Sequence, residues 1–133
     1  MKKTLFGLTA LGLLVAGTAY AGQKWPTFPN GNVNIDQTNR TAYGWISGAR
    51  NSTNTNERIS CEVYGSSGGW RGAVCSFSDD RNNNALCSTT DPNLVDAIKF
   101  VQSDSYLWVA WDTSSRCTSV STYTDSAYAP KAP

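Results

Sequence analysis

The sequence predicts a mainly β protein, bordering on α+β: a small antiparallel β-sandwich or meander with one short amphipathic helix, stapled by disulfides. Three observations lead to this class. Short segments of alternating apolar and polar residues recur between loops rich in Gly, Asn, Ser and Asp. A single segment, after Asp91, has helical periodicity. Four cysteines occur in a chain whose first residues are typical of an exported protein, and such proteins commonly carry disulfides.

Residues 1–21 are predicted to be a signal peptide of bacterial style. Two lysines precede an apolar run over residues 5–16, and Ala19-Tyr20-Ala21 places small residues where a signal peptidase reads the chain. The apolar run is too short to cross a bilayer as a helix. We therefore expect residues 22–133 to be exported to the periplasm or the extracellular space.

Charge argues against two classes of partner. Once Lys2 and Lys3 are removed, nine basic side chains face ten acidic ones, and the basic residues form no cluster. Such a chain gives no electrostatic reason to expect nucleic acid or an anionic membrane as partner. No second apolar segment is long enough to span a bilayer. We expect an unidentified protein or glycan as ligand, and the sequence does not determine the oligomeric state.

The exported part divides into an arm, a domain and a tail. Residues 22–40 form a Pro/Asn-rich N-terminal arm, in which at most Val33–Ile35 is a short edge strand. Residues 41–128 are expected to form a single β-rich domain, and residues 129–133 a flexible tail.

The first half of the domain is predicted to contain four strands. Residues 41–47 have strand composition, and Gly44 within them indicates a bulge or a close backbone approach. Residues 48–58 read as a polar loop. Alternating segments around Cys61, Cys75 and Cys87 then predict a three-strand meander, joined by turn-forming residues 65–71 and 79–84.

The second half is predicted to contain the helix and two further strands. Asp91 is a suitable N-cap and Pro92 a suitable first helical residue. Apolar residues from Leu94 to Val101 recur at helical spacing, which predicts about three turns. Residues 106–111 are apolar on both faces and indicate a central strand, and residues 117–123 form the last strand.

The four cysteines can pair in three ways, and the meander makes one of them unfavourable. If its hairpins are symmetric about residues 68 and 81, Cys75 lies opposite both Cys61 and Cys87. Cys61 and Cys87 would then be about 9.6 Å apart, whereas a disulfide needs Cα atoms within about 7 Å. Two pairings remain: Cys61–Cys75 with Cys87–Cys117, which we prefer, or Cys75–Cys87 with Cys61–Cys117.

The absence of histidine argues against most catalytic sites. It removes the usual general base, the usual metal ligand and any Ser–His or Cys–His pair. Residues 65–69 match a G-x-S-x-G motif, but in a predicted hairpin turn rather than a strand-to-helix elbow. We therefore assign no catalytic residue, no metal ligand and no cofactor. A small hydrolase using two of the carboxylates Glu57, Glu62 and Asp112 is the enzymatic alternative.

The loop over residues 79–84 carries several oxygen ligands of the kind that calcium prefers. It lacks the glycine and the terminal glutamate of helix-loop-helix calcium sites, and Arg81 opposes a cation. A plain polar turn is the simpler interpretation, and the sequence leaves calcium binding open.

Trp70 and Arg71 are the candidate binding residues. They lie near the predicted tip of the first hairpin, and an exposed tryptophan beside arginine is a common recognition anchor. The structural alternative is that Trp70 folds back over the sheet edge. The tryptophans at positions 45, 108 and 111 are expected in the core.

Several short motifs resemble a group of small exported, disulfide-containing bacterial proteins of unknown function. The resemblance covers about residues 42–131 and implies a secreted single domain without catalytic residues to transfer. Within it, Arg50 and Asn51 are a hypothetical polar structural pair. The motifs are Ala49-Arg50-Asn51-Ser52, Ile59-x-Cys61, Cys87-Ser88-Thr89-Thr90-Asp91-Pro92, Asp104-Ser105, Trp111-Asp112, Cys117 and Ser126-Ala127-Tyr128-Ala129-Pro130-Lys131.

Taken together, these features predict a secreted, non-catalytic binding or structural module that recognises a glycan or a protein through exposed aromatic and polar loops. A protein inhibitor or immunity-type partner is one alternative, and the carboxylate-dependent hydrolase is the other.

Overall fold

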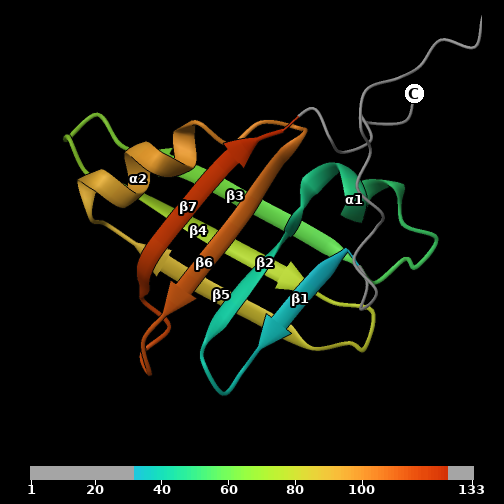
Figure 1. Cartoon of the computed structure of the whole chain (residues 1–133). Helices are drawn as coiled ribbons and strands as arrows, with labels where there is room; N and C mark the ends of the chain where they lie inside the picture. The colour runs from blue at the N-terminus through green and yellow to red at the C-terminus, as the bar shows by residue number, and fades with distance from the viewer. Residues whose placement is uncertain (1–31, 126–133) are drawn as a thin grey trace, which may run out of the picture.

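The computed structural model describes residues 32–125, which form a mainly antiparallel β fold of two sheets and two helices (Figure 1). The predicted signal peptide, residues 22–31 of the predicted arm and the predicted tail lie outside the described residues. The elements are β1 (Val33–Asp36), β2 (Thr41–Trp45), α1 (Ile46–Asn51), β3 (Arg58–Gly65), β4 (Arg71–Ser78), β5 (Asn84–Thr89), α2 (Pro92–Lys99), β6 (Ser105–Trp111) and β7 (Cys117–Thr124).

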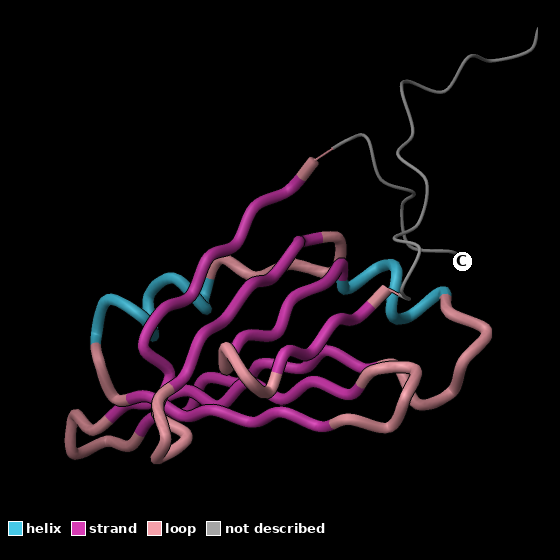
Figure 2. Tube along the Cα trace, turned by 60° about the horizontal axis from the view of Figure 1, so that its bottom comes forward, coloured by secondary structure: helices cyan, strands magenta, loops and turns pink. Residues whose placement is uncertain are grey.

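The two sheets face each other across the core. One has four strands in the order β1-β2-β6-β7, and the other is the meander β3-β4-β5. Figure 1 shows that the strands of one sheet cross those of the other. Figure 2 shows both helices beside the gap between the sheets, so neither helix covers the outer face of the three-stranded sheet.

Alternation of buried and less buried residues separates the inner face from the outer face in β4 and β6. In β4, Ala73, Cys75 and Phe77 are buried, whereas the residues between them are only partly buried. In β6, Leu107 and Val109 are fully buried against them. Burying a side chain such as Phe or Leu contributes about 1.5–3 kcal/mol, so these inner faces supply the main stabilising contacts.

The predicted meander is confirmed in its register. Cys75 lies opposite Cys61 on one side and opposite Cys87 on the other, as expected for hairpins symmetric about residues 68 and 81. Gly69 in the first turn has a φ of 83°, a left-handed conformation that glycine adopts without steric cost.

The predictions for the four-stranded sheet are also confirmed in outline. Residues 33–36 form an edge strand paired with β2, and β6 is central between β2 and β7. Gly44 marks a close backbone approach, because a Cβ there would collide with the carbonyl oxygen of Asn32.

Helix α1 was not predicted. Residues 41–47 were expected as one strand followed by a polar loop, but the strand ends at Trp45 and residues 46–51 are helical. The segment lacks a side-chain N-cap and contains Gly48, so local sequence gives no helix signal. Burial of Ser47 and Ala49 against the sheets is what stabilises this short helix.

Helix α2 begins as predicted and ends early. The Asp91 side chain accepts hydrogen bonds from the backbone N–H groups of Asn93 (2.8 Å) and Leu94 (3.3 Å). The helix stops at Lys99, about two turns long, because the backbone N–H groups of Phe100 and Val101 bond to carbonyls only three residues back.

The prediction that Trp108 lies in the core is wrong. Its alternation partners Leu107 and Val109 take the inward positions of β6, so Trp108 lies half-buried on the outer face of the four-stranded sheet. Trp45 and Trp111 are buried as expected.

Within residues 32–125, no helix has the length and apolar character that a membrane crossing requires.

Candidate functional site

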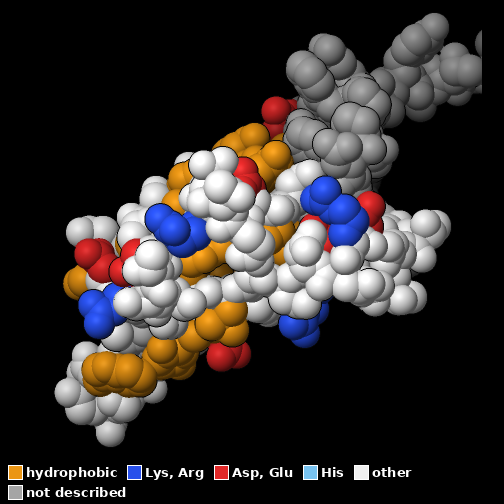
Figure 3. All heavy atoms as spheres, turned by 90° about the horizontal axis from the view of Figure 1, so that it is seen from below, with side chains coloured by type: hydrophobic (Ala, Val, Ile, Leu, Met, Phe, Trp, Pro, Cys, Tyr) orange, Lys and Arg blue, Asp and Glu red, His pale blue; other side chains and the backbone are white. Residues whose placement is uncertain are grey.

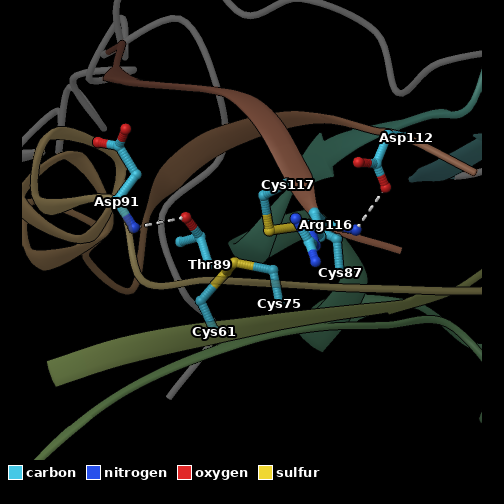
Figure 4. The surroundings of a disulfide bond; sticks show 8 residues. All are labelled: Cys61, Cys75, Cys87, Thr89, Asp91, Asp112, Arg116 and Cys117. Atoms are coloured by element: carbon cyan, nitrogen blue, oxygen red, sulfur yellow. Dashed lines mark hydrogen bonds between the residues drawn. A yellow bond between two sulfur atoms is a disulfide. The ribbon is translucent and has the colours of Figure 1, made fainter. Parts of the chain in front are cut away.

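All four cysteines are paired, as Cys61–Cys75 and Cys87–Cys117, which is the preferred of the two pairings that the sequence left open (Figure 4). The first joins neighbouring strands of the meander, with Cα atoms 4.1 Å apart. The second joins β5 of one sheet to β7 of the other, with Cα atoms 5.0 Å apart.

Trp70 and Tyr64 form an aromatic pair at the end of the first hairpin. Trp70 is 56% exposed, and its ring centre lies 5.0 Å from that of Tyr64 at an interplanar angle of 35°. The Tyr64 ring lies over Gly72, where an added Cβ would be 2.8 Å from the ring atoms. Because a larger residue at 72 would displace the ring, glycine keeps the pair flat on the outer face of the sheet. We call Tyr64 and Trp70 the aromatic platform.

Arg71 connects this hairpin to helix α2. Its guanidinium lies 3.3 Å from the Asp96 carboxylate, which also binds Lys99 at 2.8 Å. The hydrogen bond from Lys99, followed by the charges of Lys99 and Arg71, lowers the pKa of Asp96. The predicted ligand contact of Arg71 stays a prediction, and its exposed ion pair directs the guanidinium toward α2.

A pocket of about 490 Å³ adjoins the platform. It is open to solvent, and its lining carries four hydroxyls, one carboxylate and one guanidinium. Seen from below in Figure 3, apolar side chains reach the surface among polar and charged ones. The lining residues are Tyr64, Ser88, Thr89, Thr90, Asp91, Arg116 and Cys117.

Three elements meet at this pocket. The turn between β6 and β7 lies along the edge of β5, where the Ser88 N–H donates to the Ser115 carbonyl at 3.0 Å. This contact brings Arg116 beside the β5 end. Figure 4 shows Thr89, Asp91 and Arg116 around the two disulfides, and the Thr89 hydroxyl accepts from the Asp91 N–H at 3.0 Å. Hydrogen bonds and the Cys87–Cys117 disulfide therefore hold the pocket wall in place.

The three carboxylates considered for a hydrolase lie in three different parts of the fold. Glu57 is buried and accepts hydrogen bonds from the backbone N–H groups of Asn32 and Val33 at the start of β1. Burial raises the pKa of Glu57, but hydrogen bonds from Ser52, Asn32 and Val33 lower it overall. An acid held ionised in this way is a poor proton donor at neutral pH.

The other two carboxylates lie elsewhere. Asp112 accepts from the backbone N–H groups of Ser114 and Arg116 in the β6–β7 turn, and these bonds lower its pKa. Glu62 is exposed on the edge strand β3. These contacts give Glu57 and Asp112 structural roles, and the hydrolase stays an untested alternative.

The loop over residues 79–84 is organised by Asp79, which is fully buried. One carboxylate oxygen accepts from the backbone N–H groups of Arg81 (2.9 Å) and Asn83 (2.8 Å), and the other from their side chains. Both oxygens are thus directed at donors in the turn. Among residues 32–125, no group of three acidic or cysteine side chains is arranged to hold a metal ion.

The hypothetical pair Arg50 and Asn51 lies at the end of α1. Arg50 donates a long hydrogen bond (3.4 Å) to the carbonyl of Ser103, just before β6, and Asn51 is exposed. The Arg50 contact links α1 to the loop after α2, and the paired role of the two residues stays a hypothesis.

Sequence reasoning missed Tyr64, Arg116 and the pocket hydroxyls. Tyr64 could have been found: the hairpin symmetry that pairs Cys61 with Cys75 also places Gly72 opposite Tyr64. A glycine facing an aromatic residue across a strand pair is a signal for a ring lying on the backbone. Arg116 carries no such signal, because only the tertiary fold brings it beside β5.

Comparison of the chain with protein-family models, with curated proteins and with solved structures finds no match.

Proposed function

We propose that this protein is a secreted, non-catalytic binding module that recognises a glycan at the aromatic platform and the adjoining pocket. The observation that carries the proposal is the exposed Trp70 ring, paired with Tyr64 and bordered by hydroxyl, carboxylate and guanidinium groups. An exposed tryptophan on a rigid hairpin is a ready anchor for a ligand.

The chemistry of the lining favours a sugar over a protein. One face of a hexose ring presents C–H groups that pack on an aromatic ring, while its rim presents hydroxyls that both donate and accept hydrogen bonds. Ser88, Thr90 and Arg116 supply partners of both kinds beside Tyr64. The core of a protein interface is instead depleted of charged residues, whereas this pocket is lined by Asp91 and Arg116.

The two disulfides support the secreted location, because such bonds persist in oxidising compartments and stabilise small domains there.

A glycan array probed with the purified protein, followed by calorimetric titration of the best ligand, tests the proposal. Trp70→Ala is expected to weaken binding at least tenfold, which corresponds to about 1.4 kcal/mol. Phe100→Ala is the matched control, because Phe100 is also an exposed aromatic residue (74%) but follows α2 and does not line the pocket.

Equal effects of the two substitutions, with both variants folded by circular dichroism, would refute the platform as the binding site. Tight capture of one protein by a surface that Trp70→Ala does not affect would favour the inhibitor or immunity-type alternative.

A further inference from the structure

The outer face of the three-stranded sheet continues from the aromatic platform to the opposite end of the molecule. Strand register arranges its side chains in successive rows across β3, β4 and β5. After Tyr64 and Gly72 come three rows: Glu62, Val74 and Ser88; Ser60, Ser76 and Leu86; and Arg58, Ser78 and Asn84. Both helices lie beside the gap between the sheets, away from this face (Figure 2).

A second pocket lies at the far end of this face. It measures about 280 Å³ and is lined only by polar side chains: Thr55, Asn56, Arg58, Ser78, Asn82 and Asn84. Arg58, Ser78 and Asn84 form the last row, so this pocket borders the same outer face as Tyr64 and Ser88, which line the first. Gly72 and Ser78 are six positions apart along β4, which corresponds to about 20 Å along the sheet.

The floor between the two pockets contains small hydroxyl side chains and two apolar ones, Val74 and Leu86. Ser60 and Ser76 are small hydroxyl residues, so they do not obstruct a ligand that lies along the strands from one row to the next. Leu86, in the same row, is 54% exposed and can pack against C–H groups.

Formal charge along this surface is balanced. Arg58 and Glu62 lie on the same edge strand, and Arg116 and Asp91 line the same pocket. A ligand that matches this distribution is polar and uncharged.

We infer that this face binds a linear, uncharged, β-1,4-linked polysaccharide that runs from the aromatic platform across the serine floor to the second pocket. This inference rests on the proposed function and adds the ligand's length and its path. A β-1,4-linked chain is extended, so a few sugar units reach from the aromatic platform to the second pocket about 20 Å away. Its C–H groups can pack on the aromatic rings at one end, and its hydroxyls can bond the amide groups of the second pocket at the other.

Titration calorimetry with β-1,4-linked oligomers of glucose and of N-acetylglucosamine, from one to six units, tests this inference on the purified protein. Affinity for one of the two series is expected to rise at least tenfold from the dimer to the hexamer, because added units occupy added contacts at a small entropic cost. The affinity is expected to change little between low and moderate salt.

Ser76→Arg places a long side chain in the middle of the floor and is expected to abolish the gain with length while leaving dimer affinity unchanged. Ser121→Arg makes the same substitution in β7 of the other sheet and is expected to change neither. Asn84→Ala is a milder variant at the second pocket, expected to weaken hexamer binding selectively.

The outcomes separate this inference from the proposed function. If short oligomers bind through Trp70 but length adds nothing, the extended path is wrong and the platform stands. If no oligomer binds, the inference is wrong, and a glycan array without a hit would overturn the proposed function as well.

Discussion

Asp79 shows how one carboxylate organises a turn. It is fully buried after β4, and its two oxygens accept four hydrogen bonds from Arg81 and Asn83. Burial raises its pKa, but the hydrogen bonds from Asn83 and Arg81 lower it overall. The charge is therefore tolerated in the interior because donors surround it.

We expect Asp79→Asn to lower the free energy of unfolding by about 1–3 kcal/mol, because an amide N–H₂ would face backbone N–H donors. Asp80→Asn is the matched control: its side chain is 37% exposed and makes only a long contact (3.7 Å) with Arg81, so it should change stability little. Urea denaturation measures both, and equal losses would contradict the assigned role.

The pH dependence follows from five carboxyl groups and the lack of histidine. The pKa values of Asp36, Glu57, Asp79, Asp96 and Asp112 are all lowered in the folded protein. A group whose pKa is lower in the folded state stabilises the fold fully above its unfolded value, about 3.9 for Asp and 4.3 for Glu. That contribution is lost as the pH falls through the folded value.

Stability should therefore stay nearly constant from about pH 5.5 to 8, where no side chain of ordinary pKa titrates, and fall steeply below about pH 4. Chemical denaturation at a series of pH values measures this profile. A marked change of stability between pH 6 and 7 would contradict it.

At the scale of elements, three hairpin turns are built in the same way. Each begins with an aspartate that ends a strand or directly follows one, and one carboxylate oxygen accepts hydrogen bonds from backbone N–H groups two to four residues ahead. Each also contains a non-glycine residue with positive φ near its end. The aspartates are Asp36, Asp79 and Asp112, and the positive-φ residues are Arg40, Asn82 and Ser115.

Ser115→Gly is expected to stabilise the protein by about 0.5 kcal/mol. Ser115 has a φ of 57°, which is strained for a residue with a Cβ but not for glycine. Relief of this strain is expected to exceed the entropic cost of the more flexible unfolded chain that glycine introduces. Thermal denaturation measures the effect. Thr113→Gly, in the same turn but without positive φ, should instead lower stability. A loss of stability in both variants would show that the left-handed conformation carries no measurable strain.

At the scale of the whole molecule, the two disulfides connect different parts of the fold. Cys61–Cys75 closes a hairpin already held by backbone hydrogen bonds, with a sequence separation of 14. Cys87–Cys117 ties the two sheets together with a sequence separation of 30, and its Cys117 lines the pocket beside the aromatic platform.

Replacing Cys87 and Cys117 by alanine is therefore expected to destabilise the fold more than replacing Cys61 and Cys75, by about 4 against 3 kcal/mol in the chain-entropy model. Urea denaturation of the two double variants gives the comparison. Under the proposed function, the variant without Cys87–Cys117 should also bind glycan more weakly, since Arg116 would no longer be fixed beside β5. Equal stability of the two variants would contradict this ranking.

Local chemistry in the sequence determined much of this fold. Alternation and turn residues predict the strands around Cys61, Cys75 and Cys87, and hairpin symmetry predicts their register, because both depend on neighbours within about 15 residues. The Asp91 cap and Pro92 place the start of α2 for the same reason.

Contacts between distant segments were decided by the tertiary structure alone. Cys75 faces both Cys61 and Cys87 in register, so the pairing depends on where β7 brings Cys117. Helix α1 exists through packing rather than propensity. The candidate site also has a part that local sequence predicts and a part that it does not. Trp70 is recognisable in the sequence as a tryptophan at a hairpin tip, whereas the adjoining pocket forms only when the β6–β7 turn packs along β5. Sequence periodicity carries no information about which distant strand edge a turn will contact.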